Sequence, residues 1–142
     1  MIQIQTHNVT ETEHVGGSLA KKLSPGALVA FTGDLGAGKT AFCRGFLHAL
    51  GYTGHVTSPT FAIVNEYDTE RCRVCHFDMY RILDEDALYD IGWDDYFDGD
   101  TILLVEWSEN VTGALPDDRI TVNIRRGEAE DDRMITIEGG NL

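Results

Sequence analysis

The sequence predicts an α/β domain, on two main observations. An apolar run over residues 27–31 predicts a buried strand, and a glycine-rich loop and a helix follow it directly. A second apolar run, over residues 102–105, predicts another buried strand, which ends at an acidic residue. Because the chain has 142 residues, we expect one domain over residues 1–142 with a single core.

The first 26 residues predict a strand, a helix and a turn. Isoleucines alternate with polar residues over 1–5, which predicts a short edge strand. Thr10 and Glu13 have the spacing of a capping box, so we expect the helix to begin there. The apolar stripe of this helix is Val15, Leu19 and Leu23, and Ser24-Pro25-Gly26 is expected to end it.

A phosphate-binding loop is the sharpest signal in the chain. Every fixed position of the pattern GxxxxGK[ST] is matched by Gly33-Asp34-Leu35-Gly36-Ala37-Gly38-Lys39-Thr40. Glycines let backbone N–H groups turn toward a phosphate, and the start of the next helix adds a positive dipole end. We expect Lys39 to reach the β- and γ-phosphates and the Thr40 hydroxyl to bind a bridging Mg²⁺. A glycine-rich turn with a chance lysine is disfavoured by the flanking strand and helix.

The helix after this loop is predicted from Phe42, Phe46, Ala49 and Leu50, with Gly51 as its C-terminal cap. Beyond it, strand-like runs over 62–67 and 71–81 enclose a polar turn and predict a β-hairpin. A short acidic helix is predicted over 85–91, followed by a loop at 98–100. Two terminal strands are predicted over 119–125 and 134–137.

Glu106 is the candidate second acidic element, because it ends the apolar run of residues 102–105. A buried strand of this kind can deliver a carboxylate beside Mg²⁺, where it binds the metal through water or orients the attacking water. An ordinary strand that ends at an exposed glutamate is the alternative, and the phosphate-binding loop favours the functional interpretation. Trp107 follows and is a candidate for a switch or nucleotide-side role, although a core role is commoner for tryptophan.

Thr60 and Asp78 are weaker candidates. Thr60 lies in a proline-stiffened segment after the loop helix, where many nucleotide switches place a threonine that senses the γ-phosphate. Asp78 lies within His76-Phe77-Asp78-Met79-Tyr80-Arg81, a strand-like and aromatic context in which an aspartate needs a partner or a metal. Pairing with Arg81 is the simpler possibility for Asp78.

Two cysteines and a histidine form the pattern CxxCH over residues 72–76, which also occurs at haem-attachment sites and in half of a zinc site. Haem of that kind belongs to exported proteins, and a structural zinc needs a second pair of ligands, for which Cys43 and scattered histidines remain. Residues three apart in a strand also point to opposite faces. We therefore expect reduced, structural cysteines.

The formal net charge of −13 argues against direct binding of nucleic acid. Between Arg81 and Arg119 the sequence has no Lys, Arg or His, and acidic residues crowd the segment at Asp84, Glu85, Asp86, Asp90, Asp94, Asp95, Asp98 and Asp100. A solvated acidic face is the main interpretation, and a docking surface for a basic partner is the alternative. Neither a membrane-spanning run nor an export signal is found, so we expect a cytoplasmic protein with no membrane partner.

The ordered motifs resemble those of the TsaE ATPases of bacterial tRNA threonylcarbamoyladenosine synthesis. The resemblance covers residues from about 10 to 120 and rests on the segments GDLGAGKT, SPTF and HFDMYR, on residues 91–97 and on VEW. It implies a P-loop NTPase-like three-layer fold, with flanking helices and a central mixed, mainly parallel sheet. It also implies slow, Mg²⁺-dependent ATP hydrolysis.

The implied partners are the TsaB and TsaD proteins. In that complex TsaD transfers a threonylcarbamoyl group to the adenosine beside the anticodon of certain tRNAs, so this chain would meet tRNA only indirectly. ATP binding and hydrolysis would drive assembly or resetting of the complex.

Residue by residue, the resemblance places Lys39 and the loop amides up to Ala41 on the phosphates. It places Thr40 and Glu106 around Mg²⁺, with Asp78 as a further candidate ligand. Thr60, Asp78 and Trp107 become switch-type or catalytic elements. Ala41, Met79 and the cysteine pair depart from the usual pattern, and none of these departures removes a proposed ligand.

Two other functions remain open. The first is a small-molecule P-loop phosphotransferase, which normally needs a lid with arginines; the span 82–118 has no basic residue for one. The second is a nucleotide-gated interaction module with negligible turnover.

Overall fold

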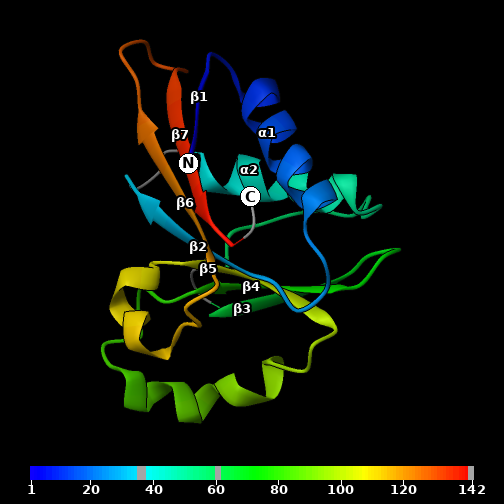
Figure 1. Cartoon of the computed structure of the whole chain (residues 1–142), viewed down its shortest axis with the longest axis vertical. Coiled ribbons are helices and arrows are strands. Elements are labelled where there is room, and N and C mark those ends of the chain that lie inside the picture. Colours follow the sequence, from blue (N-terminus) through cyan, green and yellow to red (C-terminus); the bar gives the residue numbers. More distant parts are fainter. Residues whose placement is uncertain (35–37, 60–61, 141–142) are drawn as a thin grey trace.

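A seven-stranded sheet forms the centre of the molecule (Figure 1). The computed structural model describes residues 1–34, 38–59 and 62–140 of the chain. The strands lie in the order β1-β7-β6-β2-β5-β4-β3. Their bounds are β1 Ile2–Thr6, β2 Leu28–Gly33, β3 Val64–Asp68, β4 Arg73–Asp78, β5 Thr101–Glu106, β6 Ile120–Arg126 and β7 Arg133–Gly139.

The four central strands of the sheet are parallel, and the outer strands are antiparallel to their neighbours. β2 pairs in parallel with β5 on one side and with β6 on the other, and β4 pairs in parallel with β5. β1, β3 and β7 add antiparallel pairs at the two sides. The expected mixed sheet with a parallel centre is confirmed. Because parallel strands end on one edge, the carboxyl ends of β2, β4 and β5 meet there.

Two α-helices cover one face of the sheet, and we call them the helix layer: α1 Val9–Lys22 and α2 Lys39–Ala49 (Figure 1). The prediction that α1 begins at Thr10 is wrong. Asn8 is the N-cap: its Oδ1 accepts a hydrogen bond from the Glu11 N–H, and the Glu11 carboxylate accepts one from the His7 N–H. This reciprocal cap satisfies the free amides two residues upstream of the predicted start. The predicted cap of α2 is confirmed, because Gly51 follows its C-cap with φ 94°.

Three short 3₁₀ helices cover the opposite face, and we call them the short-helix layer: η1 Glu85–Ile91, η2 Trp93–Tyr96 and η3 Ser108–Ala114. Their core is aromatic, since the Phe77 ring lies 5.0 Å from Trp93 and 4.8 Å from Tyr96, edge to face. The helix predicted over 85–91 is confirmed as η1, whereas η2 and η3 were not predicted. Two layers around one sheet confirm the three-layer α/β fold.

The remaining sequence predictions concern strands and cysteines. β5 is buried along its whole length, and β3 and β4 form the expected hairpin. Cys43, Cys72 and Cys75 are free thiols; Cys72 borders the core of the helix layer and Cys75 lies in that of the short-helix layer, as the alternation of a strand requires. Among the residues that the structure describes, no helix has the length and apolarity needed to cross a membrane.

Candidate functional site

The connection from β2 to α2 is shaped to bring backbone amides together. Gly33 ends β2 with φ 116°, and a Cβ there would collide with the Ile124 carbonyl of the neighbouring strand β6. Gly38 is the N-cap of α2 with φ 100° and supplies no side-chain cap. The first amides of α2, from Lys39 to Ala41, therefore remain available at a positive helix end. Leu35, Gly36 and Ala37 lie outside the described residues.

Asp34 points to the β6 side of this connection. Its Oδ2 accepts a hydrogen bond of 3.1 Å from the Arg126 N–H, and its own N–H donates to the Ile124 carbonyl at 3.1 Å. The Asp34 side chain thus fastens the start of the loop to the β6–β7 hairpin. Thr40, in contrast, stands in the first turn of α2 and is half-buried.

Two carboxylates lie side by side at the ends of β4 and β5. Asp78 is the register partner of Glu106, and they are only 4% and 7% exposed. Strand alternation places both on the face that α2 covers, because Leu104, two residues before Glu106, belongs to the core of that layer. Asp78 accepts a hydrogen bond from the Tyr80 N–H at 2.9 Å. Two buried carboxylates at this spacing repel each other, so a cation between them would be stabilising.

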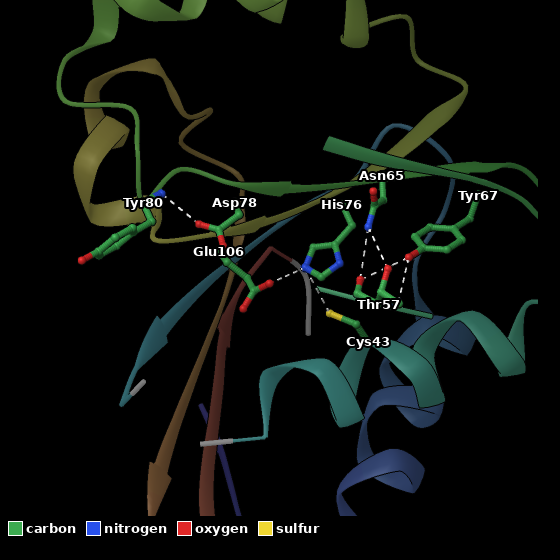
Figure 2. Close-up of polar contacts among 8 residues, drawn as sticks. All are labelled: Cys43, Thr57, Asn65, Tyr67, His76, Asp78, Tyr80 and Glu106. Carbon is green, nitrogen blue, oxygen red and sulfur yellow. Dashed lines mark hydrogen bonds and ion pairs between the residues drawn. The ribbon is translucent and has the colours of Figure 1, made fainter. Parts of the chain in front are cut away.

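His76 holds Glu106 from the neighbouring strand, as Figure 2 shows. Its Nε2 lies 2.6 Å from Oε2 of Glu106 and 3.8 Å from Sγ of Cys43 on α2, and the imidazole is fully buried. Burial disfavours the charged ring, but the neighbouring Cys43 and the Glu106 carboxylate together hold the pKa of His76 well above its usual value. The sequence alone did not predict this role for His76. The signal for it was the spacing of His76 and Asp78, which puts both side chains on one face of a strand.

Lys39 contacts Trp107, the residue that directly follows Glu106. Nζ of Lys39 lies 5.2 Å from the Trp107 ring centroid, in a cation–π contact, and Lys39 is buried. Trp107 has φ 56° and ψ 39°, a left-handed conformation that is unusual for a large side chain and costs about 1–3 kcal/mol. The ring of Tyr80, which is 57% exposed, packs against Trp107 with centroids 5.0 Å apart. The lysine of the loop and the strand-end residues thus form one cluster.

The segment before Thr60 is tied to β3. The Thr57 carbonyl accepts hydrogen bonds from Asn65 Nδ2 at 3.2 Å and from the Tyr67 hydroxyl at 3.3 Å (Figure 2). The Ile63 N–H donates to the Pro59 carbonyl at 2.8 Å, so the chain turns back toward β3. Thr60 itself, with Phe61, lies outside the described residues, and its expected role stays a prediction.

The side chains at this site suit a magnesium ion that takes some of its ligands from the protein and the others from a bound substrate and water. Within the ranges 1–34, 38–59 and 62–140 there is no group of three His, Cys, Asp or Glu side chains that could hold a metal. Mg²⁺ is usually bound by one or two carboxylates together with substrate phosphates and water, rather than by a complete protein cage. Asp78, Glu106 and the Thr40 hydroxyl fit that mode.

Comparisons with known proteins agree with the resemblance. The family model for the threonylcarbamoyl adenosine biosynthesis protein TsaE matches residues 6–135. The tRNA threonylcarbamoyladenosine biosynthesis protein TsaE of Bacillus subtilis is 41% identical over 132 residues, which are 93% of this chain and 82% of that protein. The protein of the same name from Haemophilus influenzae is 47% identical over 97 residues, or 68% of this chain and 61% of that one.

A solved structure shares the fold along nearly the whole chain. The crystal structure of Bacillus subtilis YdiB superposes with a TM-score of 0.82 at 36% identity, covering 97% of this chain and 84% of that one. Family match, sequence identity and fold all point the same way, and the chain belongs to the TsaE family.

Proposed function

We propose that this chain binds ATP at the start of α2 and hydrolyses it slowly with Mg²⁺, as the ATPase component of tRNA threonylcarbamoyladenosine biosynthesis. The observation that carries the proposal is the cluster of Lys39, at the uncapped start of α2, with the strand-end residue Trp107, which directly follows Glu106. A cation, free amides and a carboxylate are the groups that phosphoryl transfer needs in one place.

Each residue has a distinct proposed task. Lys39 and the amides of the first α2 turn would bind the phosphates. The contact of Lys39 with Trp107 does not prevent this, because a cation–π contact is weaker than a charge-assisted hydrogen bond to a phosphate. Glu106 would orient the attacking water or accept its hydrogen bond. Thr60 would sense the γ-phosphate, and Trp107 would lie at the nucleotide.

Mg²⁺, when bound, supplies the positive charge that offsets the β- and γ-phosphates. Thr40, Glu106 and Asp78 would hold it. The side-by-side register of Asp78 and Glu106 supports this assignment, because it concentrates negative charge on the face toward α2.

The proposed context is the cytoplasmic TsaB–TsaD complex, with tRNA met only through it. ATP turnover would drive assembly or resetting of that complex, not group transfer by this chain. The span 82–118 has no basic residue, which supports a role toward a protein partner and offers no arginine for a phosphotransferase lid.

Phosphate release, measured with and without the TsaB–TsaD pair, tests the proposal. We expect the pair to stimulate release. ATP consumption only after addition of a small-molecule acceptor would instead indicate a phosphotransferase, and nucleotide binding without turnover in all conditions would indicate a gated interaction module.

Two single substitutions test the proposed roles of Lys39 and Glu106. Lys39→Ala should weaken nucleotide binding and the activity of the complex, because the charge on the phosphates is lost. Glu106→Ala should keep nucleotide binding and lose turnover; a normal hydrolysis rate would show that the carboxylate is misassigned.

A further inference from the structure

Nε2 of His76 and Oε2 of Glu106 lie 2.6 Å apart, a short side-chain hydrogen bond between two neighbouring strands. We propose that His76 is a positioning residue: its Nε2–H holds Oε2 of Glu106, so that the carboxylate is fixed and Oε1 alone remains for a metal ion or a water. This inference rests on the proposed function of Glu106 in hydrolysis.

The proton of this bond can be assigned from the chemistry of the two groups. A carboxylate only accepts hydrogen bonds, so the nitrogen at 2.6 Å must carry the proton, whether the ring is neutral or charged. The Cys43 sulfur lies 3.8 Å from the same nitrogen, so its contact with that nitrogen is much longer and weaker than the bond to Glu106. Nδ1 of His76 is buried and has no hydrogen-bond partner in the described part of the chain.

His76 therefore makes its one short hydrogen bond to Glu106, through Nε2. Nδ1 is buried without a partner among the described residues, so the position of the ring does not satisfy both of its nitrogens. A buried nitrogen without a hydrogen-bond partner is unfavourable, because its contact with water is lost and not replaced. A histidine that served only to fill this part of the core could be replaced by an apolar side chain without that cost.

The strands alone would leave Glu106 adjustable. The glutamate side chain has three rotatable bonds, and fixing all of them has a cost in conformational entropy. His76 supplies a second point of attachment from β4, two residues before Asp78. One strand thus delivers both the neighbouring carboxylate and the group that orients Glu106.

Two amide substitutions separate positioning from packing. The amide nitrogen of glutamine reaches about as far as Nε2 of histidine, whereas that of asparagine reaches only as far as Nδ1. Loss of such a supporting hydrogen bond typically reduces activity by about 10–100-fold. We expect that reduction in kcat for His76→Asn, with nucleotide affinity within about threefold of wild type, and recovery of most of kcat in His76→Gln.

Three measurements accompany the kinetics. Thermal unfolding of both variants checks that each is folded. Cys43→Ala removes the packing contact on the same ring and keeps the donor, so its kcat should stay within about twofold of wild type. The imidazole Nε2–H of His76, observed by proton–nitrogen NMR, should be shifted downfield and slow to exchange, and should move upfield in Glu106→Ala.

Equal kcat in folded His76→Gln and His76→Asn, whether both are low or both are normal, overturns the positioning role. So does an Nε2–H signal that Glu106→Ala leaves unchanged. A wild-type chain that hydrolyses no ATP with its partners overturns the proposed function instead, and the NMR signal still decides whether His76 holds Glu106.

Discussion

The helix layer and the short-helix layer cover the same sheet in different ways. In the helix layer, α1 and α2 cross so closely that a Cβ on Gly45 would collide with the Glu13 carbonyl, and α2 carries Lys39 at its start. The short-helix layer consists of brief 3₁₀ segments around aromatic rings, and its surface is acidic. In the first layer the backbones of two helices approach each other closely, whereas the second layer packs through aromatic side chains.

The difference matters because the short-helix layer begins where β4 and β5 end. Asp78 ends β4 and leads through Tyr80 toward η1, and Glu106 ends β5 and leads through Trp107 into η3. Asn110 of η3 donates to the Met79 carbonyl at 2.9 Å, which links the two strand ends. If the proposed function holds, the helix layer would position the nucleotide, and the short-helix layer, which continues from the strand ends, would be the part able to change with it.

The largest expected loss of stability follows removal of the Trp93 side chain, which anchors the short-helix layer. Trp93 is 4% exposed, packs edge to face on Phe77 and Phe97, and donates from Nε1 to the Ala114 carbonyl at 3.4 Å. Trp93→Ala should lower the free energy of unfolding by about 3–5 kcal/mol, the usual cost of emptying a core site of this size. Urea unfolding measures this. Phe97→Ala is the control, since Phe97 is 43% exposed and should cost much less; equal losses would mean that Trp93 is no anchor.

The next effect concerns the crossing of α1 and α2. By helix propensity alone, Gly45→Ala would gain up to about 1 kcal/mol. Because the new Cβ meets the backbone of Glu13, which cannot swing aside, we expect a net loss of about 2 kcal/mol. Ser18→Ala, at an exposed position of α1, is the control and should change the free energy of unfolding by less than about 0.5 kcal/mol. A stabilised Gly45→Ala would show that the crossing is adjustable.

The sequence predicted well what local patterns encode. The strand and the helix that flank the loop, the buried run ending at Glu106 and the hairpin of β3 and β4 all follow from period and motif. It could not predict which strands become neighbours, so the register of Asp78 with Glu106 and the contact of His76 with Glu106 appeared only in the fold. η3 was also missed, because its start depends on the left-handed backbone of Trp107, which no tryptophan signals by itself.

The third prediction concerns the positive φ of Trp107, which lies between β5 and η3. Trp107→Ala and Trp107→Gly both remove the ring and its contacts with Lys39 and Tyr80, but alanine keeps the cost of positive φ and glycine does not. We expect the glycine variant to be more stable than the alanine variant by about 1 kcal/mol, the reverse of the usual order. Chemical unfolding of the pair measures the difference. If alanine is the more stable, the junction relaxes once the ring is gone and stores no strain.

The smallest effect compares the two layers within one molecule, through two buried thiols. Cys43 on α2 lies in the core of the helix layer, and Cys75 on β4 lies in that of the short-helix layer. Both are 0% exposed, so labelling requires local opening of the covering layer. In a Cys72→Ser background, we expect iodoacetamide to label Cys75 about three to ten times faster than Cys43, as read by peptide mass spectrometry. Equal rates would mean that both layers open together.

The pH dependence of that labelling shows whether opening is truly required. Burial, followed by the Glu66 carboxylate, raises the pKa of Cys75 to about 11 in the folded chain. If the folded form reacted directly, the labelling rate would keep rising with pH up to that value, because only the thiolate is nucleophilic. Reaction through an opened layer follows the ordinary thiol, so the rate should level off near pH 9. A plateau there, at a higher rate for Cys75 than for Cys43, would show that the short-helix layer, which follows the ends of β4 and β5, opens more readily than the helix layer.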